Sequence, residues 1–205
     1  IPVTKYTELI RNGSKPENLR PTLYDFLANK AIDFFSNTEI SLTKPADNYE
    51  LREDFYFSNV KEFIKEDISS SDSLSLHFHA ECILQELLQV RIEKQKEADA
   101  LIDADLKRLR FAYAHSVHNK KEELYFQALN KLLEKYKDLP FSAEISLEIA
   151  RYYNSLSSKY DPFNAETKKY KDYKVKAHKI CKSVIEKYPK TNAADHCKSL
   201  KYQIE

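Results

Sequence analysis

The segment Leu132-Leu133-Glu134-Lys135-Tyr136 ends a hydrophobic helical pattern shortly before Pro140, and Val184-Ile185-Glu186-Lys187-Tyr188 ends another directly before Pro189. Recurrence of a helix end and a proline turn within one chain is typical of helical repeat proteins. A tetratricopeptide unit has about 34 residues in a helix, turn, helix arrangement. The two segments lie farther apart than that, and the extra length falls in the polar, aperiodic residues 157–172.

The composition independently favours helices. The chain of 205 residues has one glycine, Gly13, and seven prolines, and 32% of its residues are charged. Tight turns in β-hairpins and β-sandwiches usually need glycine, and this chain has almost none. We therefore predict an all-α fold. Apolar residues recurring every three or four positions predict helices within residues 21–35, 59–65, 73–96, 99–113, 119–136, 142–156 and 170–187.

The serine run at residues 69–73 is the strongest boundary signal along the chain. We expect residues 1–72 to form an irregular N-terminal segment with one aromatic-rich helix and a long loop. We expect residues 73–205 to form antiparallel helical hairpins in a tetratricopeptide-like α-α superhelix with one long insertion. One continuous domain over residues 1–205 and an irregular bundle with two similar helix ends are the alternatives. Thr22 with Asp25, and Ser142, are predicted N-terminal caps.

The net charge of +1 conceals an uneven distribution. Residues 1–100 carry 12 basic and 18 acidic side chains, whereas residues 101–205 carry 21 and 14. The lysines are scattered at helical spacing, which favours a solvated face, with binding of an anionic ligand as the alternative. Basic and aromatic residues also alternate over residues 168–174, but Tyr170 and Tyr173 continue a buried stripe. We therefore predict no nucleic-acid partner.

Two of the three cysteines are symmetrically placed. Cys181 and Cys197 each lie eight residues from Pro189, at equal heights if two antiparallel helices flank that turn. This placement allows a structural disulfide, which would indicate an oxidising compartment, or two buried free thiols. Cys82 lies between apolar positions and is predicted to be a core thiol.

The histidines do not predict a metal site. His77 and His79 point to different sides of a helix. His115 and His118 share a face, but lack a third ligand and are expected to act as cations at a helix end.

Recognisable signatures of nucleophilic or metal-dependent catalysis are also missing from the sequence. We therefore predict no enzyme activity, no catalytic or metal-binding residues and no cofactor. Three tyrosines could line a binding groove, although core packing explains them equally well: Tyr113, Tyr152 and Tyr153.

Four stretches together resemble the N-terminal helical region of large bacterial alpha-2-macroglobulin-like proteins. They are PTLYDFLA at residues 21–28, AIDFF at 31–35, KPAD at 44–47 and ALIDADL at 100–106. The resemblance implies an exported, often lipid-anchored protein of the Gram-negative periplasm or cell envelope, related to protease inhibitors. The thioester motif of that family, Cys-x-Glu-Gln, is not reproduced here, because the nearest match, residues 82–85, has Leu84 in place of the glutamate. No protease-trapping role therefore transfers to any residue of this chain.

These observations lead to one main functional hypothesis. Because the chain begins at Ile1 and contains no methionine, we expect it to be a fragment of a larger protein. We expect a non-catalytic helical scaffold or protein-interaction domain. Its partners would be other domains of the same larger chain or a separate protein, and its membrane association would come only through a lipid anchor outside the fragment. The alternative is a free-standing module that binds an anionic ligand through the C-terminal lysine-rich face.

Overall fold

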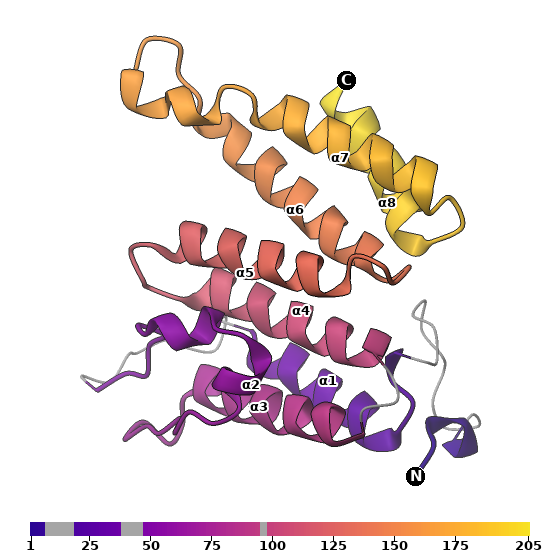
Figure 1. The fold of residues 1–205 in the computed structure, drawn as a ribbon. Coiled ribbons are helices and arrows are strands. Elements are labelled where there is room, and N and C mark those ends of the chain that lie inside the picture. The colour runs from indigo at the N-terminus through magenta and orange to yellow at the C-terminus, as the bar shows by residue number, and fades with distance from the viewer. Residues whose placement is uncertain (7–18, 38–46, 95–97) are drawn as a thin grey trace. The chain divides into compact units, whose positions relative to one another are not determined.

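The computed structural model describes residues 1–6, 19–37, 47–94 and 98–205, and within these ranges the chain is helical and has no β-strand (Figure 1). The α-helices are α1 (Leu23–Phe35), α2 (Val60–Phe63), α3 (Leu76–Lys94), α4 (Ala98–His115), α5 (Lys121–Tyr136), α6 (Ser142–Leu156), α7 (Tyr173–Lys187) and α8 (Asn192–Ile204). The 3-10 helices are η1 (Val3–Tyr6), η3 (Asp54–Phe57), η4 (Ser157–Lys159) and η5 (Ala165–Tyr170). The all-α prediction is confirmed. No helix in these ranges is both long enough and apolar enough to cross a bilayer.

The helix ends show which sequence signals act locally. Thr22 and Asp25 form the predicted capping box, in which Thr22 Oγ1 accepts the Asp25 N–H and an Asp25 carboxylate oxygen accepts the Thr22 N–H at 2.9 Å. The prediction that Ser142 caps α6 is wrong. Ser142 is the first helical residue, and its buried hydroxyl lies 3.2 Å from the Tyr188 hydroxyl. Thr191 caps α8 by accepting the Ala194 N–H.

Two predicted irregular regions are partly helical. The long loop expected in the N-terminal segment corresponds to residues 38–57, between the predicted helices 21–35 and 59–65. Of these, residues 38–46 lie outside the described residues, and the rest contains η3. The predicted insertion at residues 157–172 contains η4 and η5. Tyr170 ends η5, so α7 begins three residues later than the periodicity predicted, at Tyr173.

The chain divides into two compact units, Ile1–Tyr125 and Phe126–Glu205. In the first unit, α1 packs against α3 and α3 packs against α4. The boundary expected at residues 72/73 falls inside this unit, because the contacts between α1 and α3 join the segments on either side of it.

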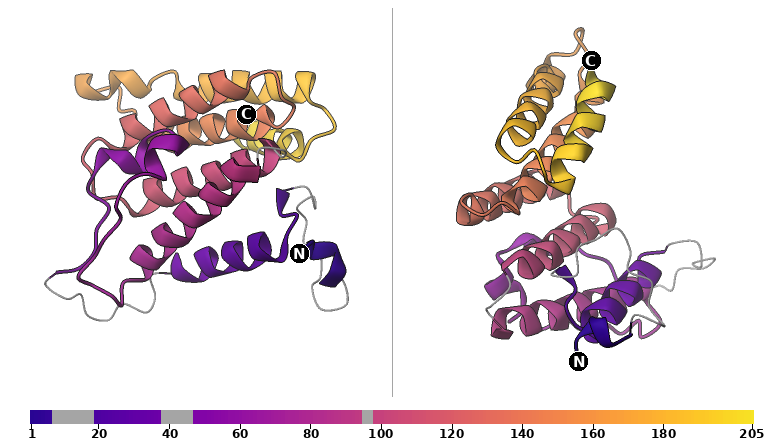
Figure 2. Two further views of the ribbon diagram at one scale, coloured as in Figure 1. Left: turned by 60° about the horizontal axis from the view of Figure 1, so that its bottom comes forward. Right: turned by 90° about the vertical axis from the view of Figure 1, so that its right-hand side faces the viewer.

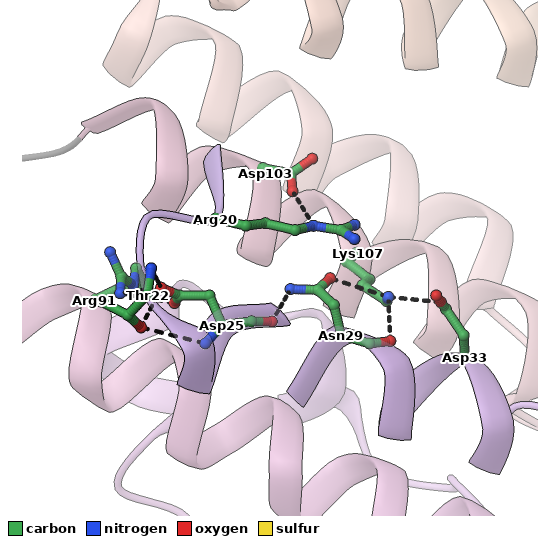
Figure 3. A network of polar contacts seen from close by, with 8 residues as sticks. All are labelled: Arg20, Thr22, Asp25, Asn29, Asp33, Arg91, Asp103 and Lys107. Atoms are coloured by element: carbon green, nitrogen blue, oxygen red, sulfur yellow. Dashed lines mark hydrogen bonds and ion pairs between the residues drawn. The ribbon is translucent and has the colours of Figure 1, made fainter. Parts of the chain in front are cut away.

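A network of polar contacts, from the buried Arg91–Asp25 pair to the more exposed Lys107–Asp33 pair, fixes α1 on its neighbours (Figure 3). Arg91 of α3 pairs with Asp25 of α1 at 2.6 Å, and both side chains are almost fully buried. Lys107 of α4 donates to the Asn29 carbonyl and side-chain oxygens, each at 3.0 Å, and pairs with Asp33 at 2.6 Å. Since breaking a buried ion pair leaves an uncompensated charge, the Arg91–Asp25 pair favours one orientation of α1, and the contacts of Lys107 add to it.

Arg108 fixes a second part of the first unit. This buried α4 side chain donates to Asp105 at 2.8 Å and to the backbone carbonyls of Tyr56 and Ser58 at 2.7 and 2.9 Å. Its guanidinium also lies 4.6 Å from the centre of the Phe63 ring. Arg108 thereby holds η3 and α2 against α4, because one planar group with several donors reaches both segments.

In the second unit, α6 packs against both α7 and α8, and α7 packs against α8. Figure 2 shows α7 and α8, in orange and yellow, side by side in two further views. Small and apolar side chains form the core between these helices. They are Ala143, Leu147, Ala150, Cys181, Val184, Ala193, Ala194, Cys197 and Leu200. Small residues let the helices approach closely, as hairpin packing requires.

Candidate functional site

The surface of α7 and α8 holds a groove of about 440 Å³. It is lined by Lys182, Ile185, Glu186, Lys198, Lys201, Tyr202 and Glu205. Several of these residues directly follow buried core residues, as Lys182 follows Cys181 and Lys198 follows Cys197. Successive side chains of a helix point about 100° apart, so the groove lies beside the buried stripe of each helix.

The groove has an apolar part and a charged rim. Ile185 is half-buried against the core, whereas Tyr202 is 83% exposed. A ring exposed to that degree on a structured helix offers apolar area together with a hydroxyl. Ile185 and Tyr202 therefore supply the contacts that a partner side chain could bury.

Each lysine of the groove has an acidic neighbour three or four positions away along the chain. The pairs are Lys182 with Glu186 at 3.9 Å, Lys198 with Asp195 at 2.8 Å and Lys201 with Glu205 at 2.7 Å. Hydrogen bonds from Lys198 and from Lys201 hold the pKa of Asp195 and of Glu205, respectively, below their usual values. Ion pairs between exposed side chains contribute little to stability, so a partner can exchange them at small cost.

The two helices that form the groove are strongly basic. Together α7 and α8 contain seven lysines and two acidic residues, Glu186 and Asp195. All of the lysines are exposed except Lys201, which is half-buried. Three of these lysines, Lys182, Lys198 and Lys201, line the groove together with Glu186 and Glu205. The lysine excess was visible in the sequence, whereas the groove was not.

The structure brings the two predicted bridge residues together. Cys181 of α7 and Cys197 of α8 are fully buried, and their sulfur atoms are hydrogen-bonded as free thiols. Because the Cys197 thiol donates to Cys181, this bond raises the pKa of Cys197 and lowers that of Cys181. The predicted facing arrangement is thus present, and the disulfide stays a prediction. Cys82 is half-buried, and burial raises the pKa of its thiol.

The histidines pair differently from their spacing in the sequence. The ring centres of His77 and His115 lie 4.2 Å apart, and both rings contact the ring of Phe111. Burial, together with the nearby His77 and Lys121, lowers the pKa of His115 to about 4. The prediction that His115 is a helix-end cation is therefore wrong at neutral pH. No cluster of three or more metal-ligating side chains occurs among the described residues.

The three candidate groove tyrosines take part in ring packing. Tyr113 stacks on Tyr125 with the ring centres 4.4 Å apart, and Tyr152 stacks on Phe126 with the ring centres 5.0 Å apart. Tyr153 contacts Phe126 as well. These contacts favour the core-packing interpretation, and the exposed aromatic residue at the groove is Tyr202 instead.

Glu81 is a buried acid that the sequence pattern did not single out. It lies on α3 with no measurable exposure, and neither carboxylate oxygen has a hydrogen-bond partner within the part of the chain that the structure describes. Desolvation raises its pKa to about 8, and the charge of Arg108 partly offsets this effect. Glu81 is therefore mostly protonated near neutral pH.

Comparisons of this chain with protein-family models, with curated proteins and with solved structures found no match.

Proposed function

We propose that this chain is a non-catalytic helical scaffold and protein-interaction module, a domain of a larger exported envelope protein. The observation that carries the interaction role is the α7–α8 groove, where exposed Tyr202 and half-buried Ile185 lie among lysines. Aromatic residues are enriched at protein interfaces because they bury large apolar areas and also form hydrogen bonds. The envelope setting rests on the resemblance to alpha-2-macroglobulin-like proteins.

The finer architecture belongs to the same proposal. Consecutive helices α6, α7 and α8 pack on one another, and the segments 132–136 and 184–188 repeat in sequence. Both observations support tetratricopeptide-like hairpins with an insertion between α6 and α7. Stacked hairpins of this type leave extended surfaces on which a peptide or a neighbouring domain can bind.

Site-specific photocrosslinking in the native cells tests the interaction role. A photoreactive amino acid replaces Tyr202 in the full-length protein, and a matched variant carries it at Phe163, which is 97% exposed and lies outside the groove. We expect a discrete crosslinked protein species or an internal crosslink from position 202, and none from position 163. Absence of a crosslink at 202, or equal labelling from both positions, would contradict the proposal.

A second candidate function is binding of an anionic ligand by the lysine-rich face. The excess of lysine over acid on α7 and α8 favours it. It predicts binding that depends on charge alone, with steep loss as the salt concentration rises.

A further inference from the structure

We infer that the α7–α8 groove binds an acidic amphipathic helix of a protein partner. The inference rests on the proposed interaction function and names the chemistry of the partner. Apolar side chains of that helix pack on Ile185 and Tyr202, and its carboxylates pair with the lysines of the groove.

The sign of the partner's charge follows from the surface around the groove. Lys182 of α7 and Lys198 of α8 both line the groove and are more than half exposed. With Lys201 they outnumber the two acidic residues of the lining, Glu186 and Glu205. Their acidic neighbours are held in exposed pairs that contribute little, so carboxylates of a partner can replace them. The excess of lysine over α7 and α8 also steers an acidic segment toward this surface and repels a basic one.

The apolar part of the groove distinguishes a helix from a simple anion. A phosphate or a polyanion would use the lysines but would leave Ile185 and the Tyr202 ring without contacts. An amphipathic helix uses both, because apolar residues spaced three and four apart form a stripe flanked by charged residues. The α7–α8 pair already accepts one helix, since α6 packs against both members.

The test uses the full 205-residue chain and defined peptides. The probe is a fluorescent, end-capped helical peptide of about 18 residues made of Glu, Ala and Leu, with the leucines on one face. One comparison peptide has the same composition with its leucine stripe broken, and another has Gln in place of Glu. We expect the probe to bind, and both comparison peptides to bind at least ~10-fold more weakly in fluorescence anisotropy.

Charge-matched variants locate the site. Lys182→Glu changes a groove lysine, and Lys174→Glu makes the same charge change at an exposed α7 residue outside the groove. At physiological salt, where the Debye length is about 8 Å, we expect Lys182→Glu to weaken probe binding ~10-fold and Lys174→Glu to change it less than ~2-fold. Tyr202→Ser should weaken it as well. Circular dichroism checks that each variant retains its helical content.

Several results would overturn the inference. Equal binding of the intact and broken-stripe peptides would indicate an anion site without helix recognition. Equal effects of Lys182→Glu and Lys174→Glu would place binding outside the groove. Self-association abolished by Lys182→Glu, without probe binding, would identify a second copy of this chain as the occupant. If any of these results occurs together with a crosslink from position 202, the proposed interaction function is still supported. Only the proposal that the partner is an acidic helix is then wrong.

Discussion

Glu81 makes the pH dependence of stability testable at a single residue. Its pKa of about 8 in the folded protein lies well above the ordinary glutamate value, because the side chain is fully buried. The folded state therefore keeps a proton that the unfolded chain releases above pH 4.5. The stability contributed by this proton is fully present below pH 4.5 and is lost as the pH rises toward about 8.

We expect Glu81→Gln to flatten this dependence. The amide cannot ionise, so the variant should match the parent near pH 5 and be more stable than the parent at pH 8, by an amount on the order of 1 kcal/mol or more. Urea unfolding followed by circular dichroism at both pH values measures the difference. Glu86→Gln changes an exposed acid on the same helix and is the matched control. Parallel pH profiles for the parent and Glu81→Gln would contradict the buried-proton explanation.

At the scale of the helix pair, the redox state of Cys181 and Cys197 is a testable feature of the core between α7 and α8. Their thiols interact across the helix pair in the reduced protein, so the structure already pairs the two residues that a bridge would join. Thiol–disulfide exchange with oxidised glutathione would oxidise both thiols and release two reduced glutathione molecules. We expect the bridge to stabilise the protein by roughly 3 kcal/mol, because it closes a short loop in the unfolded chain.

Intact mass after alkylation under denaturing conditions, with and without prior reduction, detects the bridge. In protein from its own cells, we expect Cys181 and Cys197 to be alkylated only after reduction, and Cys82 to be alkylated in both samples. The Cys181→Ser variant removes the bridge, whereas Cys82→Ser should leave it intact. Full alkylation of the unreduced parent would show that the helices are held by packing alone.

The sequence predicted the helices better than the contacts between them. Periodicity and local caps act within one helix, so the Thr22–Asp25 capping box and the α7–α8 turn were recognisable. Contacts between residues far apart in the sequence depend on how the helices pack. The pairing of His77 with His115 could therefore not be predicted from their spacing. The groove could not be predicted for the same reason. The excess of lysine is visible in the composition, but the groove forms only when α7 and α8 pack side by side and place lysines of both helices near Tyr202.

At the scale of the whole molecule, the two units each close a core of their own. Leu84 is fully buried in the core of the first unit, Ile1–Tyr125. Leu147 is almost fully buried in the core of the second unit, Phe126–Glu205. Replacing either leucine by alanine leaves a cavity and should cost about 2–5 kcal/mol of local stability. Since local unfolding follows cooperative units, the loss should be confined to the unit that carries the substitution.

Native-state hydrogen exchange resolves this prediction along the chain. We expect Leu147→Ala to accelerate exchange of protected amides in α6, α7 and α8 by at least ~30-fold, while amides of α1, α3 and α4 keep the parent rates. Leu84→Ala is the reciprocal control and should give the opposite pattern. Acceleration in both units by either substitution would show one cooperative structure over the whole chain. A confined response would instead mean that the α7–α8 groove can loosen or tighten on a partner without unfolding the first unit.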